Sequence, residues 1–470
     1  MQNNADILLM QPPHQQDANV PYLGREMPLG IAYLAAYLEK AGITVEILDL
    51  NVSAQPASDL EETLKMLRPQ FVGISSFTVD IMKANALAGR CREILPDVTT
   101  IVGGIHATAL PRMTLDEFEH FDYLIHGQGE VPLTRLIQHI KGQQDVRGIN
   151  GLAYRSNGAI TVNPRDRYLS LDELPFPARH KLKIDAYAPH PQKYITLPNT
   201  GIFSSIGCPF RCSYCSIHIV HPRYTVRSPE NVVREMEECV QRFGMRDFRF
   251  FDDCLTVDRK HITDICNLII SKKMKLHWNC QSRVDKVDRE LLVLMKKAGC
   301  HQITYGIETG TQKGLQLINK KTTLEQAEAA IRNTKDAGLE SGGSFLLGIP
   351  GETTEDIQNT ISFARKLSPD IATFYIVKAY PGTALFEKAI EKDSEAKINW
   401  EDYVIQGSPL FDIGIPQKQM LSLVEYAYHS FYFRPRYFWQ RLKKIFRSPL
   451  REARVAFKGF LMVASYFRRR

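Results

Sequence analysis

Three cysteines stand close together in the segment IGCPFRCSYCSIH, where Cys208, Cys212 and Cys215 are separated by three and then by two residues. Thiolates are soft ligands that suit zinc or iron and sulfur. Structural zinc usually has four ligands, and a four-iron cluster is normally held by four thiolates. Three cysteines would therefore leave one iron of such a cluster open to another molecule. Two alternatives remain: a zinc site that joins Cys215 with His218 or His221, and thiols that bind no metal.

Length and composition limit the number and the class of the domains that position this loop. The chain has 470 residues, which predicts two or three domains, and its 44% hydrophobic and 24% charged residues exclude a disordered or fibrous protein. No basic leader opens the chain, and no apolar stretch approaches the roughly 20 residues of a membrane span. We therefore expect a cytoplasmic protein. Its nine cysteines are then expected to be free thiols and the ligands of one metal site.

Residues 1–145 alternate continuous apolar runs, such as ADILLMQPP and ITVEILDLN, with helical segments. Such runs are typical of parallel strands buried on both faces, so we predict a doubly wound, Rossmann-like α/β domain that binds ligands at the carboxyl ends of its strands. Gly103, Gly104, Gly127 and Gly129 are expected at those ends, where backbone can approach a ligand closely. The alternative is that they only form turns. The segment QPPHQQ after the first strand lacks G-x-G-x-x-G, which argues against a nicotinamide dinucleotide.

The rest of the chain divides into three regions. Residues 146–195 are read as an ordered linker with a hairpin at RSNGAI. Residues 196–400 hold six strand and helix units, which predicts a partial (β/α)6 barrel of the TIM type with its chemistry at the carboxyl ends of the strands. Residues 401–470 are expected to be helical. The cysteine loop follows the first barrel strand, YITLPNTGIF, and the other five are expected at FRFFDD, LHWNCQSR, QITYGIE, GGSFLLG and IATFYIVKAY.

The C-x3-C-x2-C spacing, with Tyr214 before the last cysteine, resembles the radical S-adenosylmethionine superfamily. In that family three cysteines bind a [4Fe-4S] cluster, and the amino and carboxylate groups of S-adenosylmethionine chelate the fourth iron. One electron, from a reductant such as flavodoxin or ferredoxin, cleaves the sulfonium and gives a 5′-deoxyadenosyl radical that abstracts a hydrogen atom. The protein supplies binding, orientation and exclusion of water. The resemblance makes Tyr214 a cofactor-binding residue.

Residues at the ends of the second and third barrel strands have counterparts in this family. Asp252 and Asp253 lie where the family often has an acid that meets the cofactor's ammonium, although either could cap a helix instead. Arg283 is placed to pair with the methionine carboxylate through its planar guanidinium. The alternative for Arg283 is an ion pair with Asp285 or Asp288.

The fourth and fifth strands end in YGIETG and FLLGIPGET. Glu308 matches a family acid that contacts the cofactor, and its alternative is a solvated charge. Gly348 and Pro350 are similar to the segment that lies along the adenine, so both are expected to bind the cofactor. Glu352 could take part in chemistry or cap the next helix, and the cap is the simpler expectation.

The N-terminal domain resembles the cobalamin-binding class of radical S-adenosylmethionine enzymes, because it precedes the barrel and has VGGIHAT and HGQGE at its strand ends. Cobalamin is therefore the implied second cofactor. The chain departs from the D-x-H-x-x-G pattern of classical cobalamin domains, since QPPHQQ has no matching Asp or Gly. His14 could reach cobalt or be a surface residue. The alternative is a domain without cobalamin that shields the cluster.

The tail, residues 431–470, has twelve Lys and Arg and one Glu, although the whole chain carries only +7. Cations interleaved with aromatic residues are typical of helices that lie on a membrane surface. The buried side of such helices would consist of Phe438, Trp439, Phe446, Phe457 and Phe460. The alternatives are a helical cap on the barrel and, with less support, a nucleic-acid contact.

These features predict a cobalamin-dependent radical enzyme, most simply a methyltransferase that acts on an unactivated carbon of a lipophilic small molecule or secondary metabolite. The nearest alternative is an oxidative cyclase that resembles the anaerobic magnesium-protoporphyrin ester cyclases. An electron-transfer protein and a membrane-surface assembly protein are alternatives from other classes.

Overall fold

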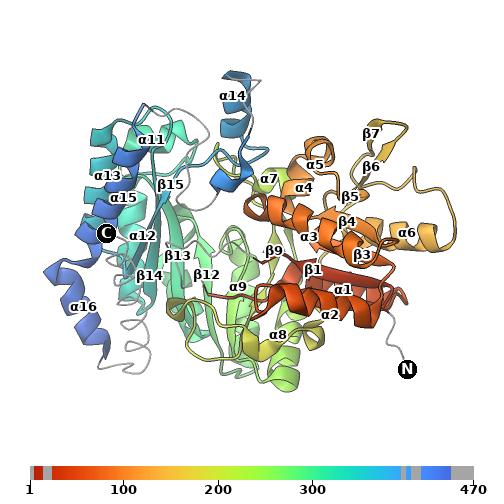
Figure 1. The fold of residues 1–470 in the computed structure, drawn as a ribbon. Coiled ribbons are helices and arrows are strands. Elements are labelled where there is room, and N and C mark those ends of the chain that lie inside the picture. The colour runs from red at the N-terminus through yellow and green to blue at the C-terminus, as the bar shows by residue number, and fades with distance from the viewer. Residues whose placement is uncertain (1–4, 14–23, 393–397, 404–413, 446–470) are drawn as a thin grey trace.

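The computed structural model describes residues 5–13, 24–392, 398–403 and 414–445, and it has two α/β units side by side. The N-terminal unit is drawn in red to orange in Figure 1, and the second unit runs from green to blue. No described helix is long and apolar enough to cross a membrane.

The N-terminal sheet has seven strands in the order β2-β1-β3-β4-β5-β6-β7. Strands β1 to β5 are parallel, and β6 and β7 add an antiparallel hairpin. The predicted linker hairpin thus extends this sheet, with Asn157 and Gly158 at positive φ in its turn. The strands are β1 (Ile7–Gln11), β2 (Val45–Asp49), β3 (Phe71–Ser75), β4 (Thr99–Gly103), β5 (Tyr123–Ile125), β6 (Leu152–Ser156) and β7 (Ala159–Val162).

Helices cover both faces of this sheet, which confirms the doubly wound fold. On β1, Leu8 and Met10 belong to one buried cluster, whereas Ile7 and Leu9 belong to another on the opposite face. A strand buried on both sides has no polar face, so its sequence is a continuous apolar run. The helices are α1 (Leu29–Lys40), α2 (Pro56–Leu67), α3 (Ile81–Ile94), α4 (Ile105–Ala109), α5 (Pro111–Glu117) and α6 (Glu130–Lys141).

The second unit is a partial barrel of six parallel strands in the order β15-β14-β13-β12-β11-β8, as predicted. Its strands are β8 (Asn199–Ile202), β11 (Asp247–Phe250), β12 (His277–Ser282), β13 (Cys300–Glu308), β14 (Glu340–Leu347) and β15 (Ile371–Ile376). Its helices are α8 (Pro229–Phe243), α9 (Arg259–Ser271), α10 (Arg289–Lys297), α11 (Gln312–Leu317), α12 (Leu324–Asp336) and α13 (Thr354–Leu367).

Local sequence signals set several of these helix ends. Helix α8 ends at Gly244, whose φ of 67° suits a residue without a side chain. Helix α12 begins with a capping box formed by Thr323 and Gln326. Ser228 precedes α8 as expected but makes no cap bond, because its hydroxyl donates instead to Asp172 at 2.8 Å.

The C-terminal region is helical in its described part. Helix α15 (Gln417–Tyr432) packs on β15, and α14 (Ala384–Lys392) and α16 (Pro435–Ile445) complete the described helices of this region. A short turn at 400–403 returns to the N-terminal unit, where the Trp400 ring meets the His106 ring edge-on at 4.7 Å. Phe446, Phe457 and Phe460 lie outside the described residues.

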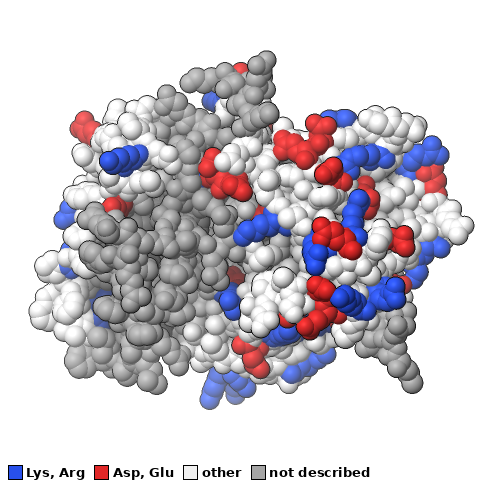
Figure 2. All heavy atoms as spheres, viewed as in Figure 1, with Lys and Arg blue, Asp and Glu red and all other residues white. Residues whose placement is uncertain are grey.

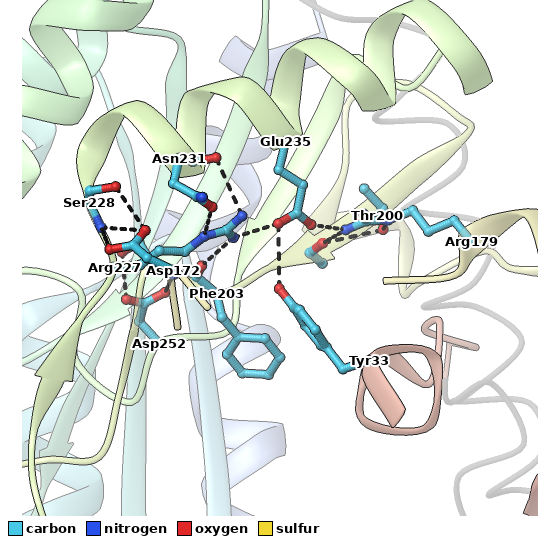
Figure 3. A network of polar contacts seen from close by, with 12 residues as sticks. Tyr33, Asp172, Arg179, Thr200, Phe203, Arg227, Ser228, Asn231, Glu235 and Asp252 are labelled. Carbon is cyan, nitrogen blue, oxygen red and sulfur yellow. Dashed lines mark hydrogen bonds and ion pairs between the residues drawn. The ribbon is translucent and has the colours of Figure 1, made fainter. Parts of the chain in front are cut away.

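The two units are joined by a buried network of charges (Figure 3). Glu235 of α8 is fully buried and accepts hydrogen bonds from Arg179, at 2.6 Å, and from Arg227. Tyr33 of α1 donates to the same carboxylate at 3.4 Å. Because Tyr33 belongs to the N-terminal unit and Glu235 to the barrel, this network fixes one unit against the other.

Surface charges of the N-terminal unit are mixed rather than segregated. Figure 2 shows Lys and Arg interspersed with Asp and Glu over its helices. Glu61, for example, pairs with Lys65 at 2.6 Å and with Arg90 at 3.3 Å. Exposed pairs of this kind contribute little to stability.

Candidate functional site

The cysteine loop is enclosed by a small hairpin directly after β8. Strands β9 (Ser205–Ile206) and β10 (Thr225–Val226) pair antiparallel on its two sides. Gly207 has a φ of 81° at the start of the loop, and a Cβ there would collide with the Arg223 carbonyl. Within the loop, the backbone N–H of Cys215 donates to the Cys212 carbonyl at 3.1 Å. The backbone of the loop is therefore compact.

Burial is the main influence on the protonation of the three thiols. Burial, with a smaller contribution from the charge of Cys212, raises the pKa of Cys208 and Cys215 to about 11. Burial also raises the pKa of Cys212, although Lys320 and Arg283 oppose it. Crowded thiolates require a cationic partner, and bound metal supplies one. The soft, three-sulfur donor set thus fits an iron–sulfur cluster.

The zinc alternative finds no support in the described residues. Among them, no three His, Cys, Asp or Glu side chains lie close enough to hold a single metal ion, and this applies to the three cysteines as well as to Cys215 with His218 or His221. His221 instead meets the ring of Tyr168 at 6.2 Å, and burial lowers its pKa to about 4.

Glu308 and Lys320 form a buried ion pair beside the cysteine loop. The Lys320 ammonium donates to Glu308 at 2.7 Å and to the Tyr214 hydroxyl at 3.4 Å. Glu308 has a φ of 72°, and a Cβ on Gly306 would collide with its carboxylate. Strained non-glycine residues of this kind concentrate at functional sites. Sequence reasoning missed Lys320, because a lysine outside any motif gives no signal of its own.

Arg283 extends from the end of β12 toward the same loop. Its guanidinium lies 3.7 Å from the centre of the Phe210 ring, which belongs to the cysteine loop. It donates to Asp285 at 2.9 Å and to the Lys320 carbonyl at 2.9 Å, whereas its Nη1 is buried without a partner. The ion pair with Asp285 therefore forms, and the guanidinium also lies close enough to Cys212 to oppose the rise that burial causes in the pKa of that thiol.

The two aspartates after β11 lie in different environments. Asp252 is buried and accepts bonds from the Ser204 backbone N–H at 2.9 Å and its hydroxyl at 2.7 Å. Asp253 is exposed and accepts from the Gly207 backbone N–H at 3.1 Å. Surrounding protein and the charge of Asp252 raise the pKa of Asp253 to about 6. Asp253 thus has an accessible carboxylate beside the cysteine loop. Asp252 links the segment after β11 to the segment after β8.

The loop after β14 is shaped by Gly348, at a φ of 80°, and Gly351, at 94°, with Pro350 between them. Glu352 does not cap α13, whose cap is Thr353. Its carboxylate instead accepts from the Ile349 backbone N–H at 2.9 Å and from the Thr309 hydroxyl at 3.2 Å. Glu352 thus ties the loop after β14 to the loop after β13, which sequence reasoning did not foresee.

The carboxyl edge of the N-terminal sheet has the properties that a corrin requires. The strand order 2-1-3-4-5 places a crevice between the ends of β1 and β3. At this edge Gly104 has a φ of 98°, and a Cβ there would lie 2.5 Å from the Ser76 carbonyl oxygen. Exposed apolar side chains, Phe77 and Ile105, follow β3 and β4. An open apolar surface with backbone close by fits a flat macrocycle.

The other expected glycines of this edge differ from one another. Gly127 has a φ of 85° and donates through its backbone N–H to the Thr108 hydroxyl at 3.0 Å, whereas Gly129 begins α6 at a negative φ. Gly103 ends β4, and a Cβ there would meet only ordinary contacts. His14 lies outside the described residues.

The two strand edges meet each other across α4 and α7 (Ile217–Val220), the helix that follows Cys215. Arg165 donates to the Ile219 carbonyl of α7 and, at 3.2 Å, to the Thr108 carbonyl of α4. The Tyr168 hydroxyl donates to the Val220 carbonyl at 2.6 Å. The glycine edge of one unit therefore faces the cysteine loop of the other. No motif marked Arg165 or Tyr168 in the sequence.

Comparison with known proteins agrees with this arrangement. The family described as the radical SAM superfamily matches residues 202–364, and the B12 binding domain matches residues 18–137. An uncharacterized methyltransferase of Pyrococcus horikoshii is 32% identical over 92% of this chain and 93% of its own. The anaerobic magnesium-protoporphyrin IX monomethyl ester cyclase of Rubrivivax gelatinosus is 30% identical, over 81% and 69% respectively.

A solved structure has the same fold. TsrM from Kitasatospora setae, a radical S-adenosylmethionine methyltransferase with cobalamin and a [4Fe-4S] cluster bound, superposes with a TM-score of 0.70. The superposition covers 84% of this chain and 79% of TsrM at 20% identity.

Proposed function

Because the chain belongs to the radical S-adenosylmethionine superfamily and carries a B12-binding domain, we propose that it methylates an unactivated carbon of a small molecule. A [4Fe-4S] cluster, S-adenosylmethionine and cobalamin are the cofactors of such an enzyme. One observation carries the proposal: the glycine edge of the N-terminal sheet meets the cysteine loop across α4 and α7. Two cofactors held at these edges would share one reaction space.

The bound cofactors would supply radical hydrogen abstraction and a transferable methyl group. The chain's own residues bind and orient them. Cys208, Cys212 and Cys215 would hold the cluster, and the Lys320 ammonium fixes Tyr214 next to it. The hairpin of β9 and β10 keeps the thiols in one compact loop.

Arg283 and Asp253 complement the two charged groups of a bound amino acid moiety. The unpartnered Nη1 of Arg283 would donate to the carboxylate of S-adenosylmethionine, and the accessible carboxylate of Asp253 would accept from its ammonium. Gly348 and Pro350 would lie along the adenine, and Glu308 would contact the same cofactor while Lys320 balances its charge.

The substrate of this reaction is proposed to have a lipophilic body. Phe203 and Phe251 directly follow the barrel strands β8 and β11, and their ring centres lie 5.7 Å apart. Leu346, on β14, is partly buried and belongs to the apolar cluster that includes Tyr214. An apolar carbon framework would pack against these side chains.

An oxidative cyclase is the second candidate, because the Rubrivivax relative with that name is 30% identical to this chain. The two reactions share cofactors and hydrogen abstraction, and they differ in whether a methyl group leaves S-adenosylmethionine. Anaerobic turnover of the reconstituted holoenzyme separates them. Methyl transfer requires both 5′-deoxyadenosine and S-adenosylhomocysteine, whereas the cyclase requires no S-adenosylhomocysteine. Absence of 5′-deoxyadenosine would overturn both candidates.

Contact with a membrane surface is proposed for the helical tail. On α16, Phe438 is 67% exposed and Trp439 is 61% exposed, and Arg436 and Arg441 lie on the same helix. Exposed aromatic residues with cations suit an anionic lipid surface. The protein should pellet with phosphatidylglycerol vesicles in a sedimentation assay. A variant with both aromatic residues replaced by serine should stay in the supernatant. Equal sedimentation of the variant would contradict the proposal.

A further inference from the structure

A short segment of the linker, residues 163–169, is anchored to the N-terminal unit at both of its ends, and we call it the strap. The His126 ring donates to the Asn163 carbonyl at 3.0 Å, and the Leu169 backbone N–H donates to the Gln128 side chain at 2.6 Å. His126 and Gln128 both belong to the loop HGQGE, which follows β5 at the carboxyl edge of the sheet. The strap therefore lies across that loop.

Gly127 lets the strap approach this loop closely. Its φ of 85° is a left-handed conformation in which a side chain would be strained, and a Cβ there would lie 3.3 Å from the Tyr168 hydroxyl. The same Cβ would lie 3.9 Å from the Arg165 side chain. Tyr168 and Arg165 thus pass close over the glycine.

Arg165 and Tyr168 supply hydrogen-bond donors to the carbonyl ends of two short helices. The last carbonyls of a helix have no partner within that helix. In α7, the Ile219 carbonyl accepts from Arg165, and the Val220 carbonyl accepts from the Tyr168 hydroxyl at 2.6 Å. The same guanidinium donates at 3.2 Å to the Thr108 carbonyl, near the end of α4. One cation thus joins the carbonyl ends of a helix from each unit, where a positive charge is favoured.

The two helices joined in this way directly follow the two expected cofactor sites. Helix α7 begins at Ile217, two residues after Cys215, so a shift of α7 would move that thiol. Helix α4 begins at Ile105, next to Gly104, whose backbone lies at the edge expected to hold cobalamin. The contact between α4 and α7 therefore relates the position of one site to that of the other.

Contacts elsewhere dock the two units independently of the strap. The Glu235 network joins α8 to α1 (Figure 3), and the Trp400 indole N–H of the C-terminal region donates to Glu117 of α5 at 2.6 Å. These contacts would remain if the strap lost its bonds to α7. The strap is thus suited to aligning α7 on α4 rather than to holding the units together.

We propose that Arg165 and Tyr168 are positioning residues, which set the orientation of the cysteine loop relative to the glycine edge by holding α7 against α4. Two cofactors that act on one substrate must keep a fixed separation, because small displacements of reacting groups slow a reaction strongly. This inference rests on the proposed function, because it assigns the residues that align the two cofactors of that site.

Magnetic interaction between the cofactors measures their alignment without any substrate. Holoenzyme reconstituted with the cluster and with cob(II)alamin is partly reduced, so that cobalt and cluster are both paramagnetic. The wild type should show a Co(II) electron paramagnetic resonance signal broadened by the nearby cluster. In Arg165→Ala the broadening should decrease at unchanged cofactor content, because α7 loses its link to α4. Arg165→Lys should restore part of it, because the charge stays near both carbonyls.

Hydrogen exchange gives a second measurement, which needs neither cofactor. The backbone N–H of Ile219 and of His221 donates within the turn of α7, to Ser216 and Ile217. Exchange in residues 217–221 should become about tenfold faster in Arg165→Ala, because a hydrogen bond from a charged donor is lost. Tyr168→Phe should have a smaller effect, since it removes one neutral donor.

Arg147→Ala is the matched control, because the Arg147 guanidinium is largely exposed and pairs with Asp145 in the N-terminal unit. It should match the wild type in both measurements. Faster exchange with unchanged broadening in Arg165→Ala would show that the strap only stabilises α7 and would overturn the inference. Wild-type behaviour of Arg165→Ala in both measurements, or no magnetic interaction in the wild type, would also overturn it. Formation of 5′-deoxyadenosine tests the proposed function separately, so the two can fail independently.

Discussion

Two buried groups of charges in this molecule differ in how completely they are paired. Around Glu235, two arginines and a tyrosine satisfy one carboxylate, and none of these side chains has a buried polar atom without a partner among the described residues (Figure 3). Beside the cysteine loop, Arg283 keeps an unpartnered Nη1 and Glu308 has a left-handed backbone. A saturated network stabilises a fold, whereas a buried donor without a partner calls for an explanation, and here we propose a bound cofactor.

The largest effect is expected from removing one cysteine of the loop beside Arg283 and Glu308, because the iron–sulfur cluster would be lost. Cys212→Ala should abolish the visible absorbance of the reconstituted iron–sulfur cluster, because two thiolates cannot hold three irons. The unfolding temperature without cluster should change little. Cys254→Ala is the sharper control, since Cys254 is close enough to raise the pKa of Cys208 but lies outside the loop. A cluster retained in Cys212→Ala would refute the assignment.

Loss of the Glu235 carboxylate, in the fully paired network, should lower the free energy of unfolding instead. Glu235→Gln leaves two buried guanidinium groups without their shared carboxylate and should cost about 3–5 kcal/mol in unfolding free energy. Chemical denaturation would measure it. Glu237→Gln is the matched control, because Glu237 makes a partly exposed pair with Lys272 and should cost at most about 1 kcal/mol. Equal losses in both variants would contradict the comparison.

Glu352 is an intermediate case, a buried carboxylate that accepts hydrogen bonds but has no cationic partner among the described residues. Burial raises its pKa from 4.5 to about 7. The folded state therefore holds its proton more tightly than the unfolded state, so the contribution is full below pH 4.5 and is lost as pH rises through 7. Between pH 5 and pH 8 the wild type should lose up to about 3 kcal/mol more stability than Glu352→Gln. Parallel pH profiles would show that Glu352 does not titrate in this range.

The smallest change tests the open donor of Arg283. Arg283→Lys keeps the charge but loses the planar fork, so binding of S-adenosylmethionine should weaken by roughly tenfold, about 1.4 kcal/mol. Equilibrium dialysis of the cluster-reconstituted protein measures it. Arg289→Lys, on the exposed start of α10, should bind normally. Unchanged binding in Arg283→Lys would mean that Nη1 does not face the cofactor.

Much of the architecture could be predicted from the sequence, because buried strands and helix ends leave local signals. The six barrel strands and the stop at Gly244 follow from apolar runs and glycine positions. Pairing across long distances leaves no such signal. Lys320 meets Glu308, and Arg165 links α4 to α7, only because the folded chain brings them together.

We propose that the three cysteines leave one iron of the cluster free for S-adenosylmethionine. Electron paramagnetic resonance of the reduced, reconstituted protein tests it most directly, with spectra recorded before and after S-adenosylmethionine is added. We expect a clear change in the cluster signal, because the cofactor's amino and carboxylate groups would bind the open iron. Identical spectra at saturating S-adenosylmethionine would contradict it.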